Sequence, residues 1–332
     1  MEIAKKLWIQ NSWADTIFYS FGWIVILALL LMFQNNYAWI ILIVLLFNYV
    51  HRHYTFALVY GENEEFSRRR LIYIALPVLA IIVTFIFIKY DSFKILLTIS
   101  IIWTMYHTVA QKYGLTRIYS RKAGYGEGRT ELWLIYSWFI FIFLFMAVQE
   151  QHTVERYRAG RVILGFLGEY MQYVNVLAYV AGAACIYFTA RYTYIEIKNW
   201  RQISIPKNIY VISIILLFSI FLYSLVIGYI VFAFSHALEY IAFVNFFVSS
   251  KYKKRPEHKS LLASASKKLW IYSSLFAIIV ILASLYGRQW NRQALEIYIV
   301  GSSFLHFIYD GMIWKVRRPE VGKPLEIKYT SN

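Results

Sequence analysis

Five of the histidines in this chain lie within apolar segments long enough to cross a bilayer. They are His51, His53, His107, His236 and His306. An ionisable side chain in hydrocarbon is costly unless a partner compensates it. Because these histidines recur at a similar depth in four separate segments, they predict a metal site inside the membrane.

Helical spacing gives three of the histidines an oxygen-bearing neighbour on the same helix face. The pairs are His107 with Gln111, His236 with Glu239, and His306 with Asp310. Residues three or four apart share a face of an α-helix. Imidazole and carboxylate together suit non-haem iron, and the partner can instead accept the hydrogen bond that orients a ligating ring. We therefore predict three histidine ligands, with the carboxylates as ligands or orienting acceptors and the Gln111 amide as an orienting group.

The fourth segment carries two histidines, His51 and His53, only two residues apart. Such neighbours point about 200° away from each other on a regular α-helix. Both can reach one site only if a π-bulge or a kink distorts the helix. The sequence predicts that at least one of them joins the other ligands and leaves open which one.

The composition predicts an all-α, polytopic transmembrane helix bundle that forms a single domain over residues 1–332. Of the 332 residues, 60% are hydrophobic and 20% are aromatic, which is more apolar surface than a soluble domain of this size can bury. A single cysteine, Cys185, excludes an intrachain disulfide and a cysteine-based metal site. Ten spans are expected, at 16–33, 37–60, 71–88, 95–119, 132–148, 172–190, 209–226, 229–249, 269–286 and 294–315.

The long apolar stretch over residues 209–249 is divided at Ile227 and Gly228, because one helix of that length would be about twice as long as the hydrocarbon is thick. Lys and Arg then concentrate in alternate loops, which predicts that both termini are cytoplasmic. This orientation accounts for the net charge of +16 without nucleic acid as a partner. The basic loops are expected to contact anionic lipid headgroups.

The dispersed histidines resemble those of integral-membrane histidine-motif iron oxygenases. That group includes fatty-acid desaturases and hydroxylases and, separately, bacterial membrane β-carotene-cleaving dioxygenases. The desaturase boxes HxxxH and HxxHH are absent, since only His51-Arg52-His53 is a close pair. The resemblance implies one or two non-haem iron ions, a lipid or isoprenoid substrate from the bilayer, an electron donor for some of these reactions, and the bacterial inner membrane.

These observations predict a metal-dependent oxidoreductase, with two alternatives left open. A b-type haem electron carrier would also place histidines on facing helices, but it normally needs opposed pairs and gives no role to the carboxylates. A proton-coupled transporter would use His, Asp and Glu as a relay, but it would be expected to show helices broken by Gly or Pro, and only Pro77 falls inside a predicted span.

Overall fold

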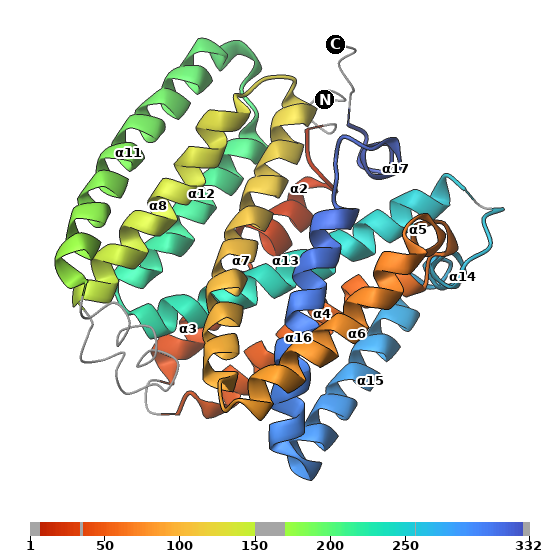
Figure 1. Cartoon of the computed structure of the whole chain (residues 1–332). Coiled ribbons are helices and arrows are strands. Elements are labelled where there is room, and N and C mark those ends of the chain that lie inside the picture. The colour runs from red at the N-terminus through yellow and green to blue at the C-terminus, as the bar shows by residue number, and fades with distance from the viewer. Residues whose placement is uncertain (1–6, 34–35, 150–169, 256, 328–332) are drawn as a thin grey trace. The chain divides into compact units, whose positions relative to one another are not determined.

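The chain is helical, without strands, over the residues that the computed structural model describes, which are 7–33, 36–149, 170–255 and 257–327 (Figure 1). Eight of these helices are long and apolar enough to cross a membrane, or nine if one bent pair counts as a single span. The all-α prediction is confirmed, and the apolar helices are compatible with an integral membrane protein.

The elements follow one another in this order: α2 (Ser12–Ala14), the π-helix η1 (Asp15–Phe21), α3 (Trp23–Met32), α4 (Ala38–Tyr60), α5 (Asn63–Arg68), α6 (Arg70–Lys89), α7 (Phe93–Ala123), α8 (Gly128–Gln149), α11 (Met171–Lys198), the 3₁₀ turn η2 (Trp200–Gln202), α12 (Ile205–Ser219), the 3₁₀ turn η3 (Ile220–Leu222), α13 (Leu225–Lys253), α14 (Leu261–Ser266), α15 (Leu269–Trp290), α16 (Arg292–Ile313) and α17 (Pro319–Gly322). All ten predicted spans overlap helices in this series. The first span is the pair bent by 48°, and α16 is a helix of sufficient length that is not apolar enough to count among the eight.

The long apolar stretch does divide, but not at the predicted position. The 3₁₀ turn ends at Leu222 and α13 begins at Leu225, so Gly228 lies inside the helix rather than at its break. A Cβ atom at Gly228 would lie 2.6 Å from Cγ of Phe221. The glycine therefore allows the Phe221 ring to pack against the first turn of α13, and the chain reverses just before it.

The chain divides into two compact units. Unit 1 comprises Met1–Ile41, Tyr106–His236 and Ile327–Asn332. Within it, α8 and α11 lie side by side, and α12 packs against α8 and η1 (Figure 1). Lys207 is fully buried on α12, and its Nζ lies 2.5 Å from Oε1 of Glu196 on α11. A buried cation in this unit therefore has a carboxylate partner.

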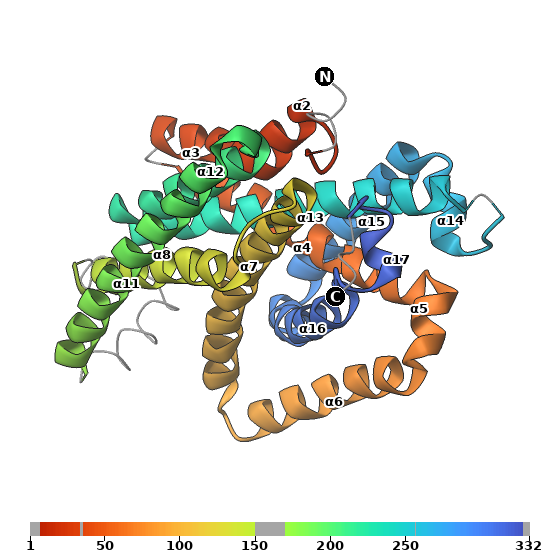
Figure 2. The same cartoon turned by 90° about the horizontal axis from the view of Figure 1, so that it is seen from above.

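Unit 2 comprises Leu42–Met105 and Ala237–Glu326. In this unit α16 packs against both α6 and α15. Figure 2 shows that α5 leads from the end of α4 into α6. The hydroxyls of Tyr60 on α4 and Tyr309 on α16 lie 2.8 Å apart, and the Tyr60 hydroxyl also donates to the carbonyl of Tyr73 on α6. These contacts hold α4, α6 and α16 together and fix the positions of the side chains on their facing sides.

Ion pairs join the segment after α4 to the segment after α13 in unit 2. Lys251 Nζ lies 2.9 Å from Glu62, Arg255 Nη1 lies 3.2 Å from Glu64, and His258 Nε2 lies 2.9 Å from Glu62. Burial alone would raise the pKa of Glu62, but the hydrogen bonds and charges of Lys251 and His258 together hold that pKa below its usual value. The two segments therefore lie at the same end of this unit, as the predicted topology requires.

Candidate metal site

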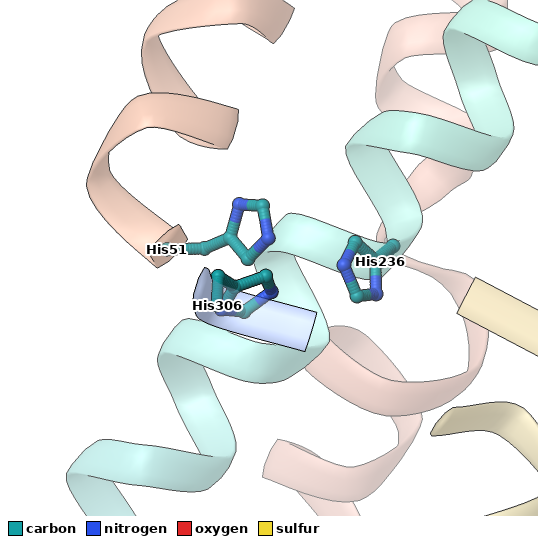
Figure 3. Close-up of side chains that lie close together, drawn as sticks. All are labelled: His51, His236 and His306. Carbon is teal, nitrogen blue, oxygen red and sulfur yellow. The ribbon is translucent and has the colours of Figure 1, made fainter. Parts of the chain in front are cut away.

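Two of the predicted histidines face each other in unit 2. His51 lies on α4 and His306 on α16, and both side chains are buried. Their rings are nearly perpendicular, at 86°, and their centroids are 4.8 Å apart (Figure 3). Both rings are therefore largely shielded from solvent.

The distance between these rings suits two adjacent ligands of one metal ion. An imidazole nitrogen binds a divalent metal at about 2.0 Å, so two rings bound at 90–109° to each other would have centroids about 4.5–5.1 Å apart. The observed 4.8 Å falls within that interval. Rings bound on opposite faces of a haem would instead be about 6 Å apart by the same geometry.

A hydroxyl on α4 connects His306 to the carboxylate of Asp310. Thr55 lies one turn after His51, and its Oγ1 is 2.7 Å from Nδ1 of His306 and 2.9 Å from Oδ1 of Asp310. Asp310 Oδ2 lies 3.7 Å from Nε2 of His306. The predicted pairing of His306 with Asp310 on one helix face is therefore found, with Thr55 as a bridge that was not predicted.

Tyr240 on α13 completes this hydrogen-bond network. Its hydroxyl donates to Oδ1 of Asp310 at 2.6 Å and lies 2.5 Å from Thr55 Oγ1, while Trp314 Nε1 donates to it at 3.3 Å. Asp310 Oδ1 thus accepts from two hydroxyls. If Thr55 donates to Asp310, it can accept from Nδ1–H of His306, which leaves the lone pair of that ring on Nε2, beside Oδ2 of Asp310.

His236 lies one turn before Tyr240 on α13. Although His236 is the last residue of unit 1 and Ala237 the first of unit 2, α13 is continuous through both. The Tyr240 ring packs against His51 at 5.7 Å and His306 at 5.5 Å between centroids. Residues four apart share a helix face, so His236 and Tyr240 lie on the same side of α13.

A second pair of predicted histidines meets in unit 1. The rings of His107 on α7 and His236 on α13 are perpendicular, with centroids 5.1 Å apart. Gln111 lies one turn after His107, and its Nε2 donates to the backbone carbonyl of His236 at 3.2 Å. The next residue, Lys112, donates to Oγ of Ser235 at 2.7 Å. Gln111 therefore contacts the backbone of the helix turn that carries His236.

The structure separates His53 from His51. Nδ1 of His53 lies 2.6 Å from the carbonyl of Tyr49, and Nε2 lies 2.6 Å from the hydroxyl of Tyr298. Both ring nitrogens are thus engaged away from His306, as the 200° separation on a regular helix requires. Glu239 is buried on α13, three residues after His236.

Another group with metal-binding residue types occurs at the end of unit 2, where Glu62, Glu64 and His258 converge. Lys251 and Arg255 form ion pairs with the same two carboxylates. The cluster is therefore compensated by its own cations, and it has less need of a metal ion than the buried histidines. His152, which the sequence analysis did not include in the site, lies outside the described residues.

Thr55, Tyr240 and Trp314 are the site residues that the sequence analysis missed. A usable signal was present for two of them, because Thr55 follows His51 by four residues and Tyr240 follows His236 by four. Hydroxyl side chains one turn from a candidate ligand are the expected hydrogen-bond partners of buried polar groups. No protein-family model, curated protein or solved structure matches this chain.

Proposed function

We propose that this chain is a membrane-embedded, non-haem iron oxygenase of the bacterial inner membrane, acting on a lipid or isoprenoid that enters from the bilayer. The observation that carries the proposal is the arrangement of His51, His306 and Asp310, in which two imidazoles have the spacing of adjacent metal ligands and a carboxylate lies beside one of them. Two histidines and one carboxylate form the ligand set of many iron oxygenases.

The residues around the site support Asp310 as the carboxylate ligand. Its Oδ1 accepts hydrogen bonds from Thr55 and Tyr240, so Oδ2 would be the oxygen that binds the metal. Two ligand atoms on one ion are about 3.0–3.6 Å apart at bond lengths near 2.1 Å. The 3.7 Å from Asp310 Oδ2 to His306 Nε2 is close to that interval.

His107 and His236 of unit 1 have a similar ring spacing, with centroids 5.1 Å apart, which supports the expectation of one or two ions. Iron bound there would supply dioxygen binding and activation, and burial of the protein groups would keep water away from the reacting chain. A hydroxylation or desaturation would need an electron donor as a partner, whereas a dioxygenase reaction would not.

Metal analysis of the purified protein tests this proposal. We expect one or two iron atoms per chain and no Soret band, with the iron content reduced in His51→Ala and His306→Ala variants that still insert into membranes. His258→Ala is the matched control and should retain the metal. A Soret band would favour a haem protein, and a chain that binds no iron but moves protons across vesicles would favour a transporter; either result would overturn the oxygenase.

A further inference from the structure

Arg52 is a buried guanidinium inside an apolar helix. It follows His51 on α4, one of the candidate membrane spans, and only 8% of the residue is exposed. A charged side chain in such an environment is costly unless an opposite charge compensates it, and arginines within membrane spans generally face a partner or a ligand. The partner of Arg52 therefore decides what the residue does.

The contacts of Arg52 are to neutral groups. Nη1 donates to Oγ of Ser302 on α16 at 3.2 Å, and the phenols of Tyr49 and Tyr298 are close enough to interact electrostatically. Among the residues that the structure describes, the buried Nε of Arg52 has no hydrogen-bond acceptor. Over the ranges that the structure describes, no carboxylate forms an ion pair with Arg52. By contrast, the buried Lys207 has Glu196 at 2.5 Å.

The position of Ser302 relates this cation to the metal site. Ser302 precedes His306 by four residues on α16, so the two share a helix face and are about 5–6 Å apart along it. Arg52 is itself the neighbour of His51. A group held by the guanidinium and the Ser302 hydroxyl would therefore lie about one helical turn from the proposed ligands.

We infer that Arg52 and Ser302 bind the carboxylate of a single-chain fatty acid and so hold the carbons next to the carboxylate closest to the histidines. The inference rests on the proposed function for the identity of the site and adds the substrate class. A guanidinium donates two parallel hydrogen bonds to a carboxylate, and one negative charge balances one positive charge. A phosphate monoester carries more charge than this single cation neutralises.

Ligand binding to the full chain in nanodiscs of neutral lipid tests the inference. The probes are the fluorescent fatty acid cis-parinaric acid and its methyl ester, at a pH at which the acid is ionised. We expect wild type to bind the acid about 10- to 100-fold more tightly than the ester, as charge-assisted hydrogen bonds predict. Arg52→Gln should abolish this preference, and Arg52→Lys should retain part of it.

Arg292→Gln serves as the matched control, because this arginine is 76% exposed at the start of α16. Its preference for the acid should equal that of wild type. Equal binding of acid and ester by wild type, or an undiminished preference in Arg52→Gln, would overturn the inference. Tighter binding of an alkyl phosphate than of the fatty acid would overturn the assignment to a carboxylate.

Two further measurements keep the result interpretable. Without ligand, Arg52→Met should be at least as heat-stable as wild type, because it removes a buried charge that has no counter-ion, whereas a structural arginine would lose stability on substitution. Iron content is measured on the same samples. If the protein contains no iron but prefers the acid in a way that depends on Arg52, the carboxylate site is upheld and the oxygenase is refuted. If the protein contains normal iron but shows no such preference, the oxygenase is upheld and the carboxylate site is refuted.

Discussion

The substitution Thr55→Val tests the hydrogen-bond network around His306 and Asp310 in the candidate metal site. Valine has nearly the same shape as threonine, so the packing of α4 is preserved while Oγ1 is lost. In the structure this oxygen lies 2.7 Å from His306 Nδ1 and 2.9 Å from Asp310 Oδ1. His306 would lose an acceptor that fixes its ring, whereas Asp310 would keep the hydrogen bond from Tyr240.

The expected size of the effect follows from these contacts. A buried polar group that loses its partner destabilises a protein by about 1–3 kcal/mol, and loss of a group that orients a metal ligand lowers metal affinity roughly 10- to 100-fold. Because Asp310 keeps the hydrogen bond from Tyr240, we expect the stability loss to lie near the lower end of that range. The loss of metal affinity should be the larger of the two effects.

The assay is competition for iron between the protein and a chelator, with thermal unfolding measured in parallel. Thr55→Ser retains the hydroxyl and should bind metal like wild type. Thr84→Val is the matched control, because Thr84 is buried in the same unit and donates only to the carbonyl of Ala80, one turn earlier on its own helix. Unchanged metal affinity in Thr55→Val, or an equal loss in Thr84→Val, would refute the role given to Thr55.

Two further predictions concern the histidine pair and the charged end of unit 2. His51→Ala should lower the iron content, and His53→Ala should leave it unchanged, since both nitrogens of His53 are engaged by Tyr49 and Tyr298; equal iron losses would contradict this separation. Glu62→Gln should lower the melting temperature near pH 7. The pKa of Glu62 is lower in the folded protein than the unfolded value of 4.5, so its ionised carboxylate stabilises the fold above pH 4.5, and this stabilisation is lost as the pH falls through the folded pKa. The difference from wild type should therefore shrink as the pH falls below 4.5 and through the folded value. Glu257→Gln alters an exposed residue and should show no difference over the same pH range. An undiminished difference in acid would contradict the ion-pair account.

Spacing along single helices was the most informative part of the sequence. The pairing of His306 with Asp310 followed from their separation of four residues, because the α-helix fixes that geometry whatever surrounds it. The choice between His51 and His53 could not be made in the same way. It depends on which neighbouring helix each face meets, and that is set by packing between segments far apart in the chain.

The features that were missed have physical reasons. Tyr240 is one of 29 tyrosines, so its residue type carries little information until its hydroxyl is seen beside Asp310. Gly228 was predicted to be the point of division because the apolar stretch is too long for one span, but its lack of a side chain serves the approach of Phe221 inside the helix instead. In both cases the deciding partner lies outside the local sequence.

The ion pairs between the segments after α4 and α13 have a consequence for biosynthesis. Glu62 and Lys251 are 189 residues apart, so at about 5–20 residues per second the carboxylate emerges from the ribosome roughly 10–40 s before its cation. During that interval Lys251 and Arg255 do not yet exist, so neither can neutralise the carboxylates that follow α4. The ion pairs form only after α13 has been made, so they stabilise the finished fold and cannot stabilise any earlier intermediate.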